Sequence, residues 1–195
     1  WIDLALRGGF DAIHLHAWWA SRGHYAVNPA LFPGGEADWK RVADRIHAAG
    51  LKVGMHTLTA GIQPRDAWVS GARCERDFID WCTHTLARPF RDGDDEIVVE
   101  EMPEPHHHTF HSFGSHGNTL RIEDEAVTYS GIRRERPYAF TGVTRGAFGR
   151  QVRGPYPAGT KVHYLFQRYD AFYPKPESEL MDKRARAIAH ARDVG

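Results

Sequence analysis

The sequence has little cysteine, no excess of charge of either sign and no long hydrophobic run. Among its 195 residues the only cysteines are Cys74 and Cys82, and two cysteines do not indicate a compartment. Lys and Arg number 25, as do Asp and Glu, which argues against nucleic acid as a partner, because phosphate binding needs a basic face. The longest apolar run, residues 17–20, is far shorter than the roughly 20 residues of a membrane-spanning helix. Neither nucleic acid nor a membrane is therefore an expected partner.

A local pattern occurs twice along the chain: a helical segment ends at glycine, and a short apolar segment follows it. The apolar segments cover about residues 10–19 and 51–59, and each is short and bounded, as a buried strand should be. Between them, Trp39 and Ile46 fall on one face of a helix that ends at Gly50. A strand, a helix and a second strand in this order predict a parallel β–α–β unit.

The segment 178–193 predicts a further helix, which would complete a second βα unit. More than a hundred residues separate it from the strand at 51–59, far more than a normal βα loop contains. Alternating apolar residues and turn residues predict that about 95–168 form a small antiparallel module in this loop. Such a module would lie at the functional face of the fold, or else shield a sheet edge. The predicted division is 1–85 and 169–195 for the α/β part and 86–168 for the module.

Residues 28–57, NPALFPGGEADWKRVADRIHAAGLKVGMHT, resemble clan D glycoside hydrolases, the α-galactosidase-like (β/α)8 barrels. In that family an aromatic-rich loop is followed by an F-P-G-G-type turn, a helix, an H-x-x-G-L-K-x-G segment and a strand. Here these pieces stand at 32–35 and 47–54, and the resemblance covers about residues 9–60. The resemblance implies a carbohydrate-active enzyme, a glycoside hydrolase that cleaves O-glycosidic bonds of an oligosaccharide or polysaccharide.

The acidic residues of that family are not matched. Its first strand ends in an acidic pair before a tryptophan, whereas this chain has His16 and Ala17 there, so galactoside specificity is not implied. The family's catalytic carboxylates come from later strands, and we expect the catalytic residues to lie outside this chain. A second resemblance, over about 120–165, is to a small β module with the sequence T-G-V-T-R-G-x-x-G, which is found in phage tail proteins and in some large barrel enzymes. That module brings no chemistry of its own.

Together these features predict an α/β fold, a partial (β/α)8 TIM barrel with a small antiparallel β insertion in a βα loop. Two strands cannot close an eight-strand barrel, so the remainder of the barrel is expected as a partner that is missing from this chain. A bacterial secreted or periplasmic location would suit such an enzyme, although the sequence does not establish a compartment.

The strand ends carry candidate substrate-binding residues. His14 and His16 lie two apart on the first predicted strand and so face the same side, and Trp18 follows on that face if the strand continues. His56 ends the second strand. Because the C-terminal ends of adjacent parallel strands meet at one edge, we expect His16, Trp18 and His56 to line one cleft, where a sugar would stack on indole and bond to imidazole. The alternative is that these residues pack in the core.

The loops after the two strands carry further candidates for substrate binding. His24 and Tyr25 follow the first strand, and Arg65 follows the second. Trp19 is a candidate because either Trp18 or Trp19 stands where the clan D family has its sugar-binding tryptophan. The planar fork of Arg65 would suit a uronate or a sulfate, but it could equally pair with the neighbouring Asp66 in solvent.

Metal ions and cofactors are not expected. Five histidines fall within residues 106–116, but adjacent histidines among Ser, Gly and Pro lack the fixed spacing of a zinc site. The acidic stretch 91–104 lacks the oxygen-ligand spacing of a calcium loop. We interpret both stretches as solvated segments.

Three functions remain open on the sequence. A glycoside hydrolase is the leading one, and a polysaccharide lyase with His16 or His56 as its base is the second. A non-catalytic carbohydrate-binding or tail-like structural protein is the third. Glycoside hydrolysis needs two carboxylates that flank the bond, and neither predicted strand ends in one, so no catalytic residue is identified.

Overall fold

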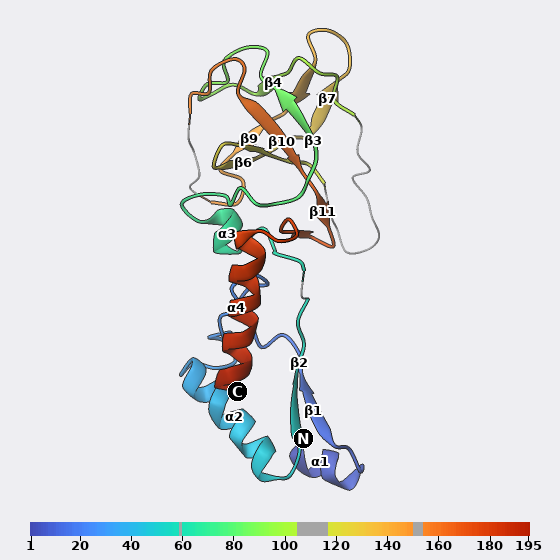
Figure 1. The fold of residues 1–195 in the computed structure, drawn as a ribbon, viewed down its shortest axis with the longest axis vertical. Helices are drawn as coiled ribbons and strands as arrows, with labels where there is room; N and C mark the ends of the chain where they lie inside the picture. Colours follow the sequence, from blue (N-terminus) through green and yellow to red (C-terminus); the bar gives the residue numbers. More distant parts are fainter. Residues whose placement is uncertain (59, 105–116, 150–153) are drawn as a thin grey trace. The chain divides into compact units, whose positions relative to one another are not determined.

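The computed structural model of the chain describes residues 1–58, 60–104, 117–149 and 154–195. The chain divides into two compact units (Figure 1), which we call the α/β unit, residues 1–59 and 182–195, and the β unit, residues 60–181. The boundaries predicted from the sequence lie at 85/86 and 168/169. The boundaries between the two units of the structure lie at 59/60 and 181/182. Helix α4 is the element that contributes residues to both units.

The described part of the α/β unit contains two strands, two helices and most of a third helix, α4. Their bounds are α1 Ile2–Arg7, β1 Ala12–Leu15, α2 Glu36–Ala48, β2 Lys52–Met55 and α4 Glu179–Val194. β1 and β2 pair in parallel, with Ala12 opposite Lys52 and Leu15 opposite Met55, and they run side by side in Figure 1. The parallel pairing of these two segments across a helix is as the sequence pattern predicts.

Helix α2 has the one-sided pattern that its sequence predicts. Trp39, Ala43 and Ile46 are buried on one face, while Lys40 and Asp44 form an exposed ion pair on the other. Acidic residues occupy its first turn and basic residues its last, an arrangement that the helix dipole favours. No described helix combines the length and the apolar content that crossing a membrane would require.

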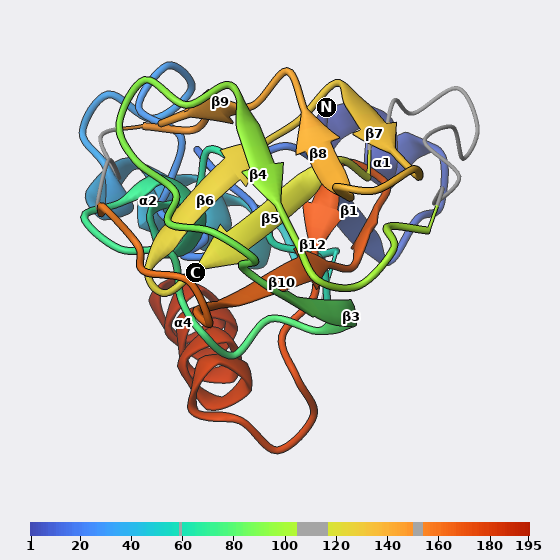
Figure 2. The ribbon, with the colours of Figure 1, turned by 90° about the horizontal axis from the view of Figure 1, so that it is seen from above.

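The described part of the β unit consists of short antiparallel strands, one short helix and the first residues of α4. A five-stranded sheet has the order β3-β10-β5-β6-β9, a three-stranded sheet has the order β4-β8-β7, and β11 pairs with β12. Figure 2 shows β5 and β6 side by side, and β4 next to β8. The bounds are α3 Ala67–Ser70, β3 Asp80–Thr85, β4 Glu96–Val98, β5 Thr119–Ile122, β6 Glu125–Thr128, β7 Gly131–Arg133, β8 Ala139–Thr141, β9 Thr144–Arg145, β10 Lys161–Leu165, β11 Gln167–Arg168 and β12 Ala171–Phe172.

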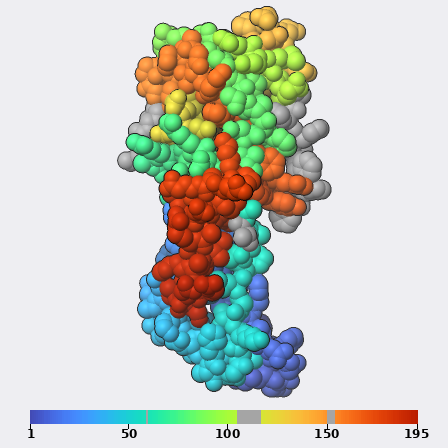
Figure 3. Space-filling view, viewed as in Figure 1, coloured from blue at the N-terminus to red at the C-terminus, as the bar shows by residue number. Residues whose placement is uncertain are grey.

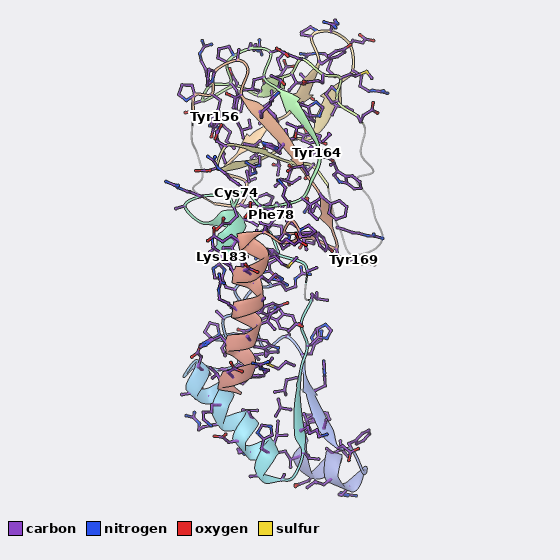
Figure 4. The ribbon with its side chains drawn as sticks, viewed as in Figure 1. Cys74, Phe78, Tyr156, Tyr164, Tyr169 and Lys183 are labelled. Atoms are coloured by element: carbon purple, nitrogen blue, oxygen red, sulfur yellow. The ribbon has the colours of Figure 1, made fainter. Side chains whose placement is uncertain are left out.

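Buried side chains from both larger sheets form one core cluster in the β unit. It joins Leu120 and Val162 of the five-stranded sheet to Ile97 and Phe140 of the three-stranded sheet. Tyr156 and Tyr164 of the same cluster are labelled in Figure 4. A second cluster contains Cys74 and Phe78, also labelled there. The antiparallel strands predicted for this stretch are confirmed, and their sheets enclose a core of their own.

The predicted TIM-barrel fragment is wrong. Among the described strands only β1 and β2 pair in parallel, and all the others form small antiparallel sheets. The second βα unit expected near the C-terminus is not formed, because β12, the strand before α4, pairs antiparallel with β11. Glycine-terminated helices and short apolar segments indicate local secondary structure, but they do not indicate which strands pair, because pairing depends on turns and long-range contacts.

Candidate functional site

Three histidines lie together at the ends of the two parallel strands. His14 and His16 are exposed residues at alternate positions along and just after β1, and His56 directly follows β2. Because the strands are in register, the backbone N–H of His56 donates to Leu15 O at 3.0 Å. The centroid of the His56 ring then lies 4.4 Å from that of His16 and 5.5 Å from that of His14. The structure thus brings His16 and His56 together, as expected from the strand ends.

The aromatic ring beside these imidazoles is that of Trp19. The half-buried Trp19 indole lies 5.9 Å from the His56 ring at an interplanar angle of 21°, and 5.7 Å from the His16 ring, between centroids. An antiparallel bridge from Trp19 to Val27 holds this part of the loop. We call His14, His16, Trp19 and His56 the imidazole–tryptophan cluster.

Trp18 does not line a cleft, which corrects the prediction made for it. Its side chain is 1% exposed and stacks on Trp39 and Tyr25, with centroids 5.0 and 5.6 Å apart. The prediction assumed that the strand continues, but β1 ends at Leu15 and Ala17 has a φ of 54°, a left-handed conformation that redirects the chain. The indole Nε1 donates to His56 O at 3.1 Å, so Trp18 supports the cluster from the core.

Tyr25 is also buried, at 2% exposure, so it contributes no open surface. Its hydroxyl accepts hydrogen bonds from the backbone N–H of Leu58 at 2.9 Å and from Arg184 Nη2 at 3.2 Å. Arg184, 1% exposed, also donates to Leu58 O at 2.5 Å and to Gly23 O at 3.4 Å. Arg184 therefore ties together the segments that follow β1 and β2.

Sequence reasoning missed Arg184, although the chain carries a signal for it. Leu180, Ala187, Ile188 and Ala191 form the apolar side of α4 in the sequence, and position 184 falls among them at helical spacing. A cation at such a position must find acceptors in the interior. Its partners could not be named from the sequence, because the acceptors are backbone carbonyls of distant segments.

The two remaining candidates, His24 and Arg65, are both exposed. His24 is exposed on the loop after β1. Arg65 is exposed and belongs to the β unit, so it is not part of the cluster that the α/β unit builds. Its neighbour Asp66 is 1% exposed and accepts a hydrogen bond from the backbone N–H of Trp68 at 3.0 Å, as the N-cap of α3.

The imidazole–tryptophan cluster disfavours positive charge at its centre. Desolvation first, and then the neighbouring His16 and His14 imidazoles, lower the pKa of His56 below its ordinary value of 6.5. At neutral pH His56 is therefore an uncharged imidazole, which has one nitrogen that donates and one that accepts a hydrogen bond. A ring in this state can bond to hydroxyl groups in either direction.

The described residues offer no nucleophilic thiol. Burial raises the pKa of Cys74 to about 12, and desolvation, followed by the charge of Asp80, raises that of Cys82. Thiols in this state are unreactive, because the thiolate is the attacking species. The acidic residue Glu125 is fully buried and paired with Arg145, so it supports the β unit structurally.

Within the described ranges, no group of three or more His, Cys, Asp or Glu residues is placed to hold a metal ion. The histidine-rich segment 106–116, which the sequence suggested as solvated, lies outside the described residues.

Comparison of the chain with protein-family models, curated proteins and solved structures found no match.

Proposed function

We propose that the chain is part of a carbohydrate-active protein and that its imidazole–tryptophan cluster binds a saccharide. The observation that carries the proposal is the Trp19 indole packed beside the His56 and His16 rings, with centroids 5.9 and 5.7 Å away. A pyranose has an apolar C–H face that stacks on an indole, and hydroxyl groups around its rim that suit neutral imidazoles. The cluster combines both kinds of contact at the ends of two strands.

Recognition at this surface suits a neutral sugar better than an anionic one. His56 is uncharged at neutral pH because its pKa is lowered, and the ring contacts of the three histidines are with one another and with Trp19. A single stacked sugar with a few hydrogen bonds supports only weak binding, with a Kd of about 1 mM, or ~4 kcal/mol. An oligosaccharide that reaches beyond the cluster would bind more tightly.

The reaction that we assign to the whole protein is hydrolysis of glycosidic bonds, on the strength of the sequence resemblance over about residues 9–60. Hydrolysis requires a pair of carboxylates about 5–10 Å apart. The cluster offers imidazoles and an indole, so its part in that reaction is to hold and orient the sugar.

A second candidate is a polysaccharide lyase, which the lowered pKa of His56 favours. A lyase base removes the proton next to a uronate carboxyl group, and an uncharged imidazole is able to accept that proton. The two reactions differ in their products, because elimination leaves an unsaturated sugar that absorbs in the ultraviolet. Incubation with a polyuronate and with neutral polysaccharides therefore separates lyase from hydrolase.

The binding proposal is tested by calorimetric titration of the purified chain with a panel of neutral oligosaccharides of the cello, xylo, manno and galacto series. We expect one series to bind with a Kd of about 1 mM or below, and Trp19→Ala to weaken it at least about tenfold, a loss of ~1.4 kcal/mol. Trp81→Ala is the matched control, since Trp81 is 54% exposed on β3 of the β unit. Equal losses in both variants, or binding that Trp19→Ala leaves unchanged, would contradict the proposal.

A further inference from the structure

An apolar hollow of about 830 Å³ lies against β1 in the α/β unit. It is lined by residues of α1, β1 and α2 and by residues next to them, and β2 contributes none of its lining. Most of the lining is apolar, but it includes Asp3, Arg45, His14 and His16. Trp1, Leu4 and Phe10 line it while they are 93%, 57% and 65% exposed. The N-terminal segment, drawn in blue, forms part of the surface in Figure 3. Large apolar side chains gathered at one hollow are a feature of interaction sites.

The strand beside this hollow has one unused edge among the described residues. β1 pairs with β2 alone, and the carbonyls of Asp11 and Leu15 accept hydrogen bonds from β2 and from the residue after it. Backbone groups alternate in direction along a strand. The N–H and C=O groups of Ala12, His14 and His16 therefore point away from β2, and they form a template for a further strand.

We propose that two copies of this chain associate through this edge, with β1 of one copy antiparallel to β1 of the other and a twofold axis at His14. Outward-facing residues then pair with outward-facing residues, so that His14 faces His14 of the second copy and Ala12 faces His16 of the second copy. This arrangement uses every free backbone group of the edge, with about six hydrogen bonds across the axis. The same patch serves both copies, as a twofold interface requires.

Side chains support a second copy as the occupant of the hollow. Ile13 and Leu15 face the apolar cluster that includes Ile46 of α2. In the proposed pair, Ile13 and Leu15 of the second copy lie on that same face, because residues paired across two strands point to one side. The apolar layer of each copy then continues into that of the other and covers both hollows.

The area that becomes buried is of the right order for such a pair. An aromatic side chain buries about 150–250 Å², so Trp1 and Phe10, both largely exposed, contribute roughly 300 Å² per copy. Over two copies this is about half of the ~1,200 Å² at the lower end of specific interfaces. Leu4 and the two strand edges add to it.

Sedimentation velocity of the full chain tests this pairing. We expect a concentration-dependent dimer at micromolar concentrations, and Leu4→Glu should raise its Kd at least about tenfold by placing a charge in the hollow. Leu31→Glu is the matched control, because Leu31 is also 57% exposed but does not line the hollow. Circular dichroism checks that both variants are folded. A wild-type chain that stays monomeric at about 100 μM, or equal effects of the two variants, would overturn the proposal.

Cross-linking tests the register even if a charged variant fails to fold. Residues that face each other in a hydrogen-bonded antiparallel pair have Cα atoms about 5.5 Å apart, within the range that a disulfide spans. His14→Cys should therefore give a disulfide-linked dimer on mild oxidation, whereas Ala30→Cys, on an exposed loop, should remain monomeric. Similar yields from the two variants would show that collision rather than strand pairing brings the copies together, and would overturn the assigned axis.

Discussion

The two units bury their strands to very different degrees. In the α/β unit no residue of β1 or β2 is fully buried, whereas in the β unit all four residues of β5 and three of the four in β6 are buried. Exposed large apolar side chains show the same contrast among the described residues. The α/β unit has Trp1, Leu4, Leu6, Phe10, Leu31 and Leu58, and the β unit has Trp81, Met102 and Tyr169.

This difference distinguishes a unit whose buried groups stabilise its fold from a unit whose exposed groups are available to bind ligands or partners. In the β unit the buried carboxylate of Glu125 is paired with Arg145 of the same unit. The α/β unit leaves one face of β1 with His14 and His16 exposed, and one edge of β1 unpaired within the described chain. Surfaces that bind ligands or partners must stay accessible, so the unit whose strands are less covered is the one that carries both of our proposals.

The largest effect is expected in the β unit. Glu125→Gln should destabilise it by about 3–5 kcal/mol, because the substitution leaves the buried Arg145 guanidinium without its counter-charge. Native-state hydrogen exchange of β5 and β6 amides measures this loss. The control is Glu123→Gln, which breaks an exposed pair with Arg76 and should cost about 0–1 kcal/mol. A similar, small effect of both substitutions would mean that the buried pair is not essential.

Trp18→Ala should destabilise the α/β unit by about 3–5 kcal/mol, since it empties a fully buried site between Trp39 and Tyr25. Hydrogen exchange of the α2 amides should report the loss, and the amides of β5 should stay protected as in the wild type. If Trp18→Ala keeps full protection in α2, then Trp18 is not the core residue that the structure shows.

Arg184→Met should destabilise the α/β unit by about 2–3 kcal/mol, because it leaves the buried carbonyl of Gly23 and the part-buried carbonyl of Leu58 without this donor. Arg186→Met provides the comparison, as Arg186 is exposed on the same helix. Thermal unfolding of the two variants should show a midpoint below that of the wild type for Arg184→Met and an unchanged midpoint for Arg186→Met. Equal midpoints would argue against a role for Arg184 in joining the two segments.

The smallest effect is a pH dependence of the α/β unit. His56 has a lowered pKa in the folded state, so below about pH 6.5 the unfolded chain takes up a proton more readily than the folded one. Stability should therefore fall as the pH drops from 7.5 to 5, until the folded pKa is passed. His56→Gln should flatten this dependence in the hydrogen exchange of the β2 amides, and an unchanged slope would rule out His56 as its source.

Much of the local structure of the α/β unit could be predicted from the sequence. The spacing of Trp39 and Ile46 indicates the buried face of α2, and the glycine-bounded apolar segments indicate β1 and β2. Because parallel strands in register bring their ends together, the meeting of His16 and His56 also followed from the pattern. These features depend on short-range periodicity, which a single sequence contains.

Features that depend on one backbone torsion or on distant partners could not be predicted. The positive φ of Ala17 directs Trp19 rather than Trp18 to the imidazoles. An alanine at that position does not indicate a positive φ, so the sequence could not predict it. The antiparallel pairing of β12 with β11, which excludes a second βα unit, depends on a turn between them. β3 spans Asp80–Thr85, inside the segment assigned from the sequence to the α/β part. Its partner strand is β10, Lys161–Leu165, which lies far along the chain, so the pairing could not be inferred from local sequence.

The central claim, that the imidazole–tryptophan cluster of the α/β unit binds a sugar, is tested most directly by nuclear magnetic resonance of the histidine rings. The side-chain signals of His16 and His56 should shift when a neutral oligosaccharide that binds the chain is added, and Trp19→Ala should abolish the shifts. The signals of His84, buried in the β unit, should stay in place. Shifts confined to histidines of the β unit, or no shift at His16 and His56 under saturating sugar, would contradict the account.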